Sequence, residues 1–232
     1  MKIVVLHGQA HKGSTYNITK LFLEKLSDEN TEIIEFFMPR DTPAFCIGCF
    51  SCFTKGEEKC PHADKVQPIV KEIDKADLLI LESPCYIYGM SGQLKTFLDH
   101  LAYRWMAHRP HPKMFNKVGL AISTAAGAGT KKVTKSLKDN LFHWGVPKIY
   151  CYGKNVGASS WETVKPKKKL KIEKEVEKLS RKIARHVGKV KPGLKTKLMF
   201  LIMRIGQKAN DWNPTDREYW VENGWLDANR PW

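Results

Sequence analysis

The sequence predicts an α/β protein with a five-stranded parallel sheet in the order 2-1-3-4-5, helices on both faces and a helical C-terminal extension. Short β-branched and apolar runs alternate with segments of helical periodicity, and this alternation is typical of parallel strands joined by crossover helices. The alternation ends near residue 155, where the composition turns basic. We therefore expect a sheet domain over residues 1–155, which includes a cysteine-rich loop at 40–62, and an extension over residues 156–232.

Five segments have the composition of strands, and four segments between them have helical spacing. The run Leu78-Leu79-Ile80-Leu81 is continuously apolar, which is typical of a parallel strand buried on both faces. In the first helix, Ile18, Leu21, Phe22 and Leu26 recur at helical spacing. The expected strands are 2–7, 32–38, 77–83, 117–123 and 147–153. The expected helices are 14–26, 64–75, 92–103 and 130–144.

The extension is predicted to contain a basic helix at 168–188, a break at Pro192-Gly193 and an apolar helix at 195–207. Its tail holds four of the seven tryptophans, Trp212, Trp220, Trp225 and Trp232. Residues 198–203 are apolar on every side but too few to span a bilayer. We favour packing of this helix on the domain or on a partner subunit; the alternative is contact with a membrane surface through its basic flanks.

The formal net charge is +15, and it is concentrated in the extension. Residues 165–208 contain sixteen Lys or Arg against three Glu. Such a field can attract nucleic acid, an anionic membrane or phosphorylated cofactors, but a solvated helix face explains it as well. No helix-turn-helix, zinc-finger or RNA-recognition signature is present, so we expect no nucleic-acid partner.

The N-terminal segment has an apolar run too short for a signal peptide, and no small-residue cleavage site follows it. We therefore expect a cytoplasmic protein. In a reducing compartment, its six cysteines are expected to be thiols or metal ligands rather than disulfides.

Ligands of such sheets bind at the carboxyl ends of the strands, at the point where the strand order reverses. The loop of residues 8–17 places Ser14 and Thr15 at a helix N-terminus, where hydroxyls, free amides and the helix dipole suit a phosphate. The loop lacks the dinucleotide-binding motif G-x-G-x-x-G and the Gly-Lys-Ser ending of a nucleotide P-loop. The alternative to a phosphate site is an ordinary capped turn between a strand and a helix. The loops at 83–92 and 123–130 offer aromatic rings, backbone amides and glycines, which suit a flat heterocycle. Three such loops at one sheet edge predict a cofactor pocket.

The three loops resemble a known family. Gly-Gln-Ala-His-Lys-Gly-Ser-Thr-Tyr-Asn, Cys-Ile-Gly-Cys-Phe-Ser-Cys-Phe, Ser-Pro-Cys-Tyr-Ile-Tyr-Gly-Met-Ser-Gly-Gln-Leu-Lys and Ser-Thr-Ala-Ala-Gly-Ala-Gly are similar, in register over about residues 1–155, to the NAD(P)H-dependent FMN reductase and iron–sulfur flavoprotein family of flavodoxin-like proteins. The family often has Ser-Pro-Arg where this chain has Gln9-Ala10-His11. An arginine contact to phosphate is therefore missing, and Lys12 is a weaker substitute.

The resemblance implies FMN as the bound cofactor and NAD(P)H as the electron donor. The phosphate is expected at Ser14, Thr15 and Asn17, and the ring near residues 86–89 and 126–129. The full set of expected cofactor-binding residues is Gly8, Gln9, His11, Lys12, Gly13, Ser14, Thr15, Asn17, Ser83, Pro84, Tyr86, Ile87, Tyr88, Gly89, Thr124, Ala125, Ala126, Gly127 and Gly129.

Cys46, Cys49, Cys52 and Cys60 form a C-x2-C-x2-C-x7-C run. Iron–sulfur flavoproteins carry a compact motif of this kind that binds one [4Fe-4S] cluster through cysteine thiolates. Two alternatives remain open: a structural zinc ion, which also accepts four thiolates, and cysteines that stay free.

The resemblance implies an FMN-dependent NAD(P)H oxidoreductase that passes electrons to a quinone, a flavin or another acceptor, and a homodimer or homotetramer. The alternative is an electron carrier between proteins, with flavin and cluster but no small-molecule substrate. The strongly basic charge favours the enzyme. We name no catalytic residue, because the chemistry belongs to the cofactor. His100, His108 and His111 are expected to be structural, Lys95 and Asp99 to pair across one helical turn, and Arg104, Arg109 and Lys113 are candidates for the phosphates of the nicotinamide cofactor.

Overall fold

The computed structural model describes all residues, 1–232. Five parallel strands form one sheet in the order β2-β1-β3-β4-β5, which confirms the predicted topology. The register is continuous at the carboxyl edge, where His7 of β1 pairs with Phe37 of β2 and with Glu82 of β3. The strands are β1 Lys2–His7, β2 Glu32–Phe37, β3 Leu78–Pro84, β4 Val118–Ala125 and β5 Lys148–Asn155.

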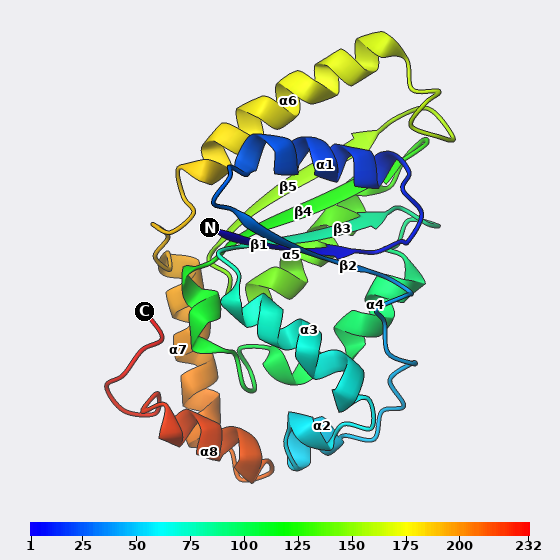
Figure 1. Cartoon of the computed structure of the whole chain (residues 1–232). Helices are drawn as coiled ribbons and strands as arrows, with labels where there is room; N and C mark the ends of the chain where they lie inside the picture. The colour runs from blue at the N-terminus through cyan, green and yellow to red at the C-terminus, as the bar shows by residue number, and fades with distance from the viewer.

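Helices cover both faces of the sheet (Figure 1). On one face α1 and α6 pack side by side over a core that contains Ile3, Phe22 and Ile172. On the other face α3, α4 and α5 cover a core that contains Leu6, Phe97 and Trp144. The helices of the sheet domain are α1 Ser14–Leu26, α2 Ser51–Thr54, α3 Ala63–Lys75, α4 Gly92–Asp99 and α5 Thr130–His143, with short 3-10 turns at Glu57–Lys59, Ala102–Arg104 and Pro112–Asn116.

The C-terminal extension comprises α6 Pro166–Ala184, α7 Leu194–Lys208 and α8 Pro214–Glu222. The first of these helices completes the core on one sheet face, because Ile172, Val176 and Ile183 are buried with the residues of α1. The other two lie on the side of the sheet away from α6, and α8 lies beside α2 (Figure 1).

Apolar side chains fix α7 and α8 to the sheet domain. Phe200 and Trp220 stack with 4.9 Å between their ring centroids, and Phe115 of the sheet domain meets Phe200 edge to face. These residues belong to a separate buried cluster with Met106, Trp225 and Leu226. One face of α7 is therefore buried on the domain, as the favoured interpretation of the sequence expected. Its other face is exposed, with Leu198, Ile202 and Ile205 open to solvent.

Three local features differ from the expectations. The helix expected at 92–103 ends at Asp99 and continues as a 3-10 turn. The helix α8 was not predicted; Pro214 occupies its first turn, and the Asn213 side chain caps it by accepting from the amide of Asp216. A third difference is the short helix α2, which forms inside the cysteine-rich loop. No helix combines the length and apolar composition needed to cross a membrane.

Candidate functional site

A pocket of about 250 Å³ opens at the carboxyl edge of the sheet, where the predicted loops converge. It lies between the start of α1 and the ends of β3 and β4. Ten of the expected cofactor-binding residues line it: Gln9, His11, Gly13, Ser14, Thr15, Pro84, Tyr86, Thr124, Ala125 and Ala126.

The start of α1 is built to receive an anion. Gly13 is the N-cap residue, no side chain caps the helix, and no acidic residue lies in its first turn. The first-turn amides are therefore free to bind a ligand. Thr15 is fixed by a buried hydrogen bond of 2.7 Å between its hydroxyl and that of Thr124 in β4.

The other expected residues of this loop stabilise it without lining the pocket. The amide of Asn17 donates to the carbonyls of Gly13 (2.9 Å) and Lys12 (3.2 Å), so it closes the loop. The ammonium group of Lys12 lies 5.3 Å from the ring centre of Tyr16. Gly8 is required by a close approach, because a Cβ atom there would lie 2.8 Å from the Glu82 carbonyl oxygen.

The loop after β3 ends in a tight turn between Tyr86 and Gly89, whose backbones exchange two hydrogen bonds of 2.9 Å. The two central residues, Ile87 and Tyr88, have positive φ angles of 48° and 60°. Such a turn normally uses Asn or Gly, and a β-branched residue there is strained. Gln9 donates to the Tyr86 hydroxyl (3.1 Å), so the loops after β1 and β3 are joined.

Ile87, Tyr88 and Gly89 form the rim of this turn and do not line the pocket, and Ile87 is almost fully exposed. Ser83 is buried, and its hydroxyl accepts from the amide of Ser91. The two remaining expected glycines lie in the loop after β4. Gly127 has open space around it, whereas Gly129 has φ +101° and lies against Cys85 and Tyr88.

Six residues that line the pocket were not expected: Tyr16, Glu82, Cys85, Val156, Ala158 and Ser159. The last three follow β5, whose carboxyl end lies at the same edge of the sheet. Glu82 is the most informative of the six, because a carboxylate inside a buried apolar strand is a signal visible in the sequence. Its side chain is 1% exposed, and its Oε2 atom has no hydrogen-bond partner.

Glu82 belongs to a row of three titratable groups, of which His7 and Glu82 are buried and Glu35 is partly exposed. His7 lies between Glu82 (Nδ1 to Oε1, 2.9 Å) and Glu35 (Nε2 to Oε1, 3.0 Å). Burial raises the pKa of Glu82. Burial opposes protonation of His7, but its two carboxylate partners outweigh it and raise the pKa of His7. The hydrogen bond from His7 lowers the pKa of Glu35. Glu82 and His7 therefore keep their protons to higher pH than the free side chains do, and Glu35 stays ionised to lower pH.

The four cysteines of the predicted motif lie in the cysteine-rich loop of residues 40–62, which is called the cysteine segment below. Cys46 and Cys49 are exposed and Cys52 and Cys60 are half-buried, and all six cysteines of the chain are free. Cys46 and Cys52 line the same hollow of about 300 Å³. Cys60 lies against His100, with 3.8 Å between its sulfur and Nδ1.

The donor set of this segment suits an iron–sulfur cluster or zinc, because four thiols are the ligands that either group takes. Burial, with the neighbouring thiols Cys60, Cys46 and Cys49, raises the pKa of Cys52 to about 11. A hydrogen bond from Ser51 lowers the pKa of Cys49. No three Cys, His, Asp or Glu side chains are already grouped around a common metal position, so binding would require the thiols to converge.

The histidines considered for catalysis, and Lys95 with Asp99, make contacts within the protein. His100 bonds to the carbonyl of Ala44 (2.8 Å), and Lys95 pairs with Asp99 as expected. His111 lies 3.6 Å from Asp74, with burial lowering its pKa.

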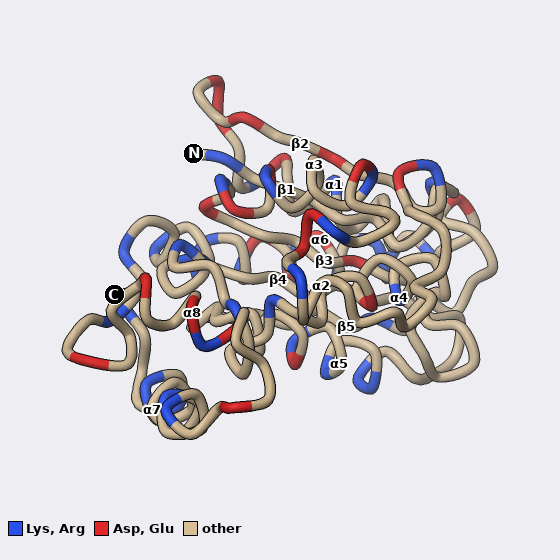
Figure 2. Tube along the Cα trace, turned by 90° about the horizontal axis from the view of Figure 1, so that it is seen from below, with Lys and Arg blue, Asp and Glu red and all other residues tan.

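Arg104 and Arg109 were candidates for the nicotinamide phosphates, but both are buried, in ion pairs with Asp74 and Asp216 respectively. Their guanidinium groups therefore do not face solvent. Lys113 is exposed. Lys and Arg are spread over the molecule, on α5 and α7 among other elements (Figure 2).

The chain is similar to known flavin-dependent proteins. Residues 1–157 match the family model for NADPH-dependent FMN reductase. An iron–sulfur flavoprotein from Archaeoglobus fulgidus is 27% identical over 231 residues, which cover 97% of this chain and all of that protein. A second iron–sulfur flavoprotein, from Methanocaldococcus jannaschii, is 34% identical over 146 residues, 61% of this chain and 72% of the relative.

Among solved structures, an FMN-dependent NADH-azoreductase from Bacillus anthracis in complex with FMN superimposes with a TM-score of 0.60. It is 16% identical, and the match covers 79% of this chain and all of that one. At this identity the likeness concerns the fold.

Proposed function

Because the chain belongs to the NADPH-dependent FMN reductase family and is an NAD(P)H-dependent FMN oxidoreductase, we propose that it holds FMN in the pocket at the carboxyl edge of the sheet and delivers electrons to a quinone, a flavin or another acceptor. The observation that carries the proposal is the uncapped start of α1, which opens into a pocket lined with hydroxyl groups. A phosphate monoester fits this donor set, because free amides and hydroxyls donate to its oxygens.

Each part of the pocket has its own task in this proposal. Ser14, Thr15 and the first-turn amides of α1 hold the phosphate, and the Thr15–Thr124 hydrogen bond keeps that hydroxyl in place. Tyr86 and the backbone of residues 124–126 border the ring. When bound, FMN accepts a hydride from NAD(P)H and releases electrons singly or in pairs. The protein supplies position and a fixed electrostatic environment.

We further propose that Cys46, Cys49, Cys52 and Cys60 hold a [4Fe-4S] cluster. Support comes from four free thiols on one segment and from two relatives named iron–sulfur flavoproteins. A structural zinc ion and metal-free thiols are the alternatives, and they predict different metal contents.

The experiment is purification without oxygen, followed by an absorbance spectrum and assays of iron, zinc and acid-labile sulfide on one sample. Flavin with about four irons and four sulfides per chain supports the full proposal. Flavin with zinc or with no metal refutes the cluster. In Cys52→Ser, iron content is expected to fall, whereas Cys151→Ser is the matched control, because Cys151 is exposed on β5, outside the cysteine segment.

Phosphate binding and turnover are tested separately. Ser14→Ala is expected to weaken FMN binding about tenfold and to leave riboflavin binding unchanged, because riboflavin has no phosphate. Equal losses for both ligands would place the phosphate elsewhere. Rapid bleaching of the bound flavin by NADH or NADPH supports the enzyme, and indifference to both nucleotides would favour a carrier between proteins.

A further inference from the structure

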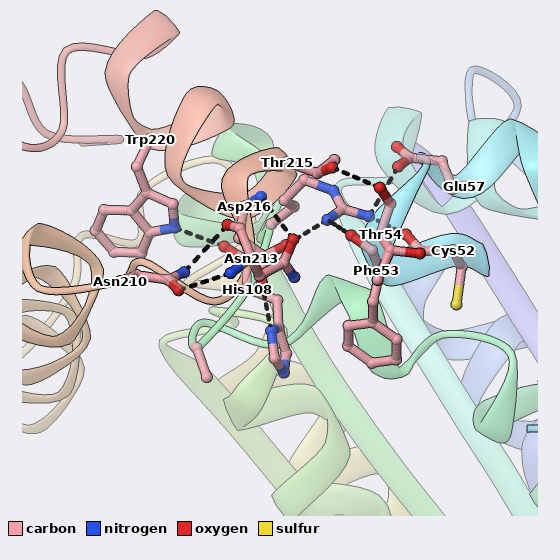
Figure 3. A network of polar contacts seen from close by, with 12 residues as sticks. Cys52, Phe53, Thr54, Glu57, His108, Asn210, Asn213, Thr215, Asp216 and Trp220 are labelled. Carbon is pink, nitrogen blue, oxygen red and sulfur yellow. Dashed lines mark hydrogen bonds and ion pairs between the residues drawn. The ribbon is translucent and has the colours of Figure 1, made fainter. Parts of the chain in front are cut away.

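A buried ion pair between Asp216 of the C-terminal extension and Arg109 of the sheet domain lies beside Cys52 of the cysteine segment (Figure 3). Asp216 of α8 is fully buried and Arg109 is 5% exposed, and the two side chains bond through Oδ1 and Nη1. The second carboxylate oxygen of Asp216 accepts from His108 Nδ1 at 2.7 Å. The pair joins residues that lie 107 positions apart in the sequence.

Arg109 holds the main chain of the helix that carries Cys52. Its guanidinium donates to the carbonyl of Cys52 and, at 3.2 Å, to that of Phe53. The hydroxyl of Thr215 in α8 donates to the carbonyl of Thr54 at 3.0 Å. The last carbonyls of a helix have no partner within it. Three successive carbonyls at the end of α2 are thus bound by Arg109 and α8.

The loop that carries Arg109 is in turn held by the extension. Three side chains of the extension donate to carbonyls of residues 107–110: Gln207 to Ala107 (2.6 Å), Trp220 to His108 (2.5 Å) and Tyr219 to Pro110 (2.8 Å). Asp216 therefore holds the guanidinium group of Arg109, and these hydrogen bonds hold the backbone on either side of it.

A buried ion pair is an unusual way to attach a helix. Desolvation of the two charges offsets most of their attraction, and an apolar contact of the same size is often as stable. The aromatic cluster around Phe200 and Trp220 already provides such an apolar contact between the extension and the domain. The ion pair adds a fixed orientation of α2, because the planar guanidinium group of Arg109 binds the carbonyls of Cys52 and Phe53 at fixed angles.

We propose that Arg109, fixed by Asp216, is a positioning residue for Cys52, and that the C-terminal extension serves to hold the cysteine segment in place for the group bound there. The identity of that group rests on the proposed function; the fixing of Cys52 does not. In this arrangement α2 opens less often, so that the Cys52 thiol is kept in one place and stays half-buried.

The first test uses the protein without metal, under reducing conditions. The alkylation rate of each cysteine by N-ethylmaleimide is measured by mass spectrometry in the wild type and in Asp216→Asn. Loss of the pair is expected to raise the rate at Cys52 about tenfold, because local opening becomes easier, while the rate at Cys151 stays unchanged. An unchanged rate at Cys52 in a folded Asp216→Asn protein would overturn the proposal.

The matched control is Asp74→Asn. It breaks another carboxylate–arginine pair, between the partly buried Asp74 and the buried Arg104, that makes no hydrogen bond to α2. General destabilisation of the protein would raise the alkylation rate at Cys52 in both variants, and that result would count against a positioning role. If Asp216→Asn fails to fold, Thr215→Ala tests the same point, because it removes a single exposed hydrogen bond to α2. The alkylation rate at Cys52 is then expected to rise about threefold. An unchanged rate would overturn the proposal.

The second test uses the protein as purified without oxygen. Release of iron to a chelator is expected to be faster in Asp216→Asn and in Arg109→Lys than in the wild type, because Lys keeps the charge but lacks the fork. Rates in Asp74→Asn should match the wild type, and release at equal rates in all four proteins would refute the positioning role. If the purified protein contains no iron, the proposed cluster fails, and the alkylation rates still decide the role of Arg109.

Discussion

His7 and Glu82 share a hydrogen bond of 2.9 Å between neighbouring positions of β1 and β3, and both side chains are buried. Only Oε1 of Glu82 is used by this bond, and Oε2 has no partner although Glu82 borders the pocket. An ionised carboxylate close to a phosphate would be repelled, whereas a neutral carboxyl group can donate a hydrogen bond. The protonation state of Glu82 therefore bears on ligand binding.

FMN affinity is expected to fall as the pH rises. Burial raises the pKa of Glu82 above its ordinary value of 4.5, so the group is neutral below the raised pKa and negative above it. The repulsion should weaken FMN binding about tenfold across that transition. In Glu82→Gln the affinity should not fall over the same range. The check is fluorescence titration of FMN from about pH 5 to 9, with riboflavin as the ligand without phosphate; equal pH dependence in both proteins would exclude this role.

The free energy of unfolding of the ligand-free protein is expected to depend on pH through the charge of His7. Burial opposes its charge, but the hydrogen bonds with Glu35 and Glu82 outweigh burial and raise its pKa above 6.5. The charged imidazole thus stabilises the fold fully below pH 6.5, and this contribution is lost as the pH rises through the raised pKa.

We therefore expect His7→Gln to lose more unfolding free energy at pH 6 than at pH 9, by roughly 1–2 kcal/mol. Urea denaturation at several pH values measures it. His143 provides a control of opposite sign, because burial lowers its pKa, and His143→Gln should gain relative stability toward acid. A loss from His7→Gln that is the same at every pH would show that the imidazole is uncharged.

Gly129 is expected to be essential to the shape of the pocket. Its φ of +101° is unfavourable for any residue with a Cβ atom, and such an atom would lie 2.5 Å from the sulfur of Cys85. Gly129→Ala should cost about 1–3 kcal/mol of stability and weaken FMN binding, because Cys85 would have to move. Gly127→Ala is the matched control in the same loop, since a Cβ atom added there would meet nothing within 4 Å, and it should bind FMN normally. Calorimetry of both variants makes the comparison, and equal affinities would contradict the prediction.

Much of the fold follows from local sequence patterns. The buried strands are continuous apolar runs such as Leu78 to Leu81, and their alternation with helices determines the parallel topology. The loops after β1, β3 and β4 could be assigned to the pocket because parallel strands bring their carboxyl ends to one edge. The same argument, applied to β5, would have found Val156 and Ser159.

The remaining features depend on distant residues. The helix α8 begins at an Asn-Pro pair that a turn would also use, and its burial depends on Phe200 and Phe115. Arg109 was a candidate for the phosphates of the nicotinamide cofactor, and only the folded chain brings Asp216 to it. Nothing in the local sequence distinguishes a buried arginine of this kind from one that binds phosphate.

The attachment of α7 should depend on one of its faces only. Phe200 is 1% exposed and contacts Trp220 and Phe115, whereas the adjacent Leu201 is 46% exposed. Phe200→Ala is expected to cost about 3–5 kcal/mol, because it removes a buried ring and leaves a cavity. Leu201→Ala should change stability by less than about 0.5 kcal/mol, since its side chain is already half in solvent. Urea denaturation of both variants, followed by tryptophan fluorescence, tests the difference. Equal small losses would mean that α7 and α8 are held mainly by the polar contacts around Arg109.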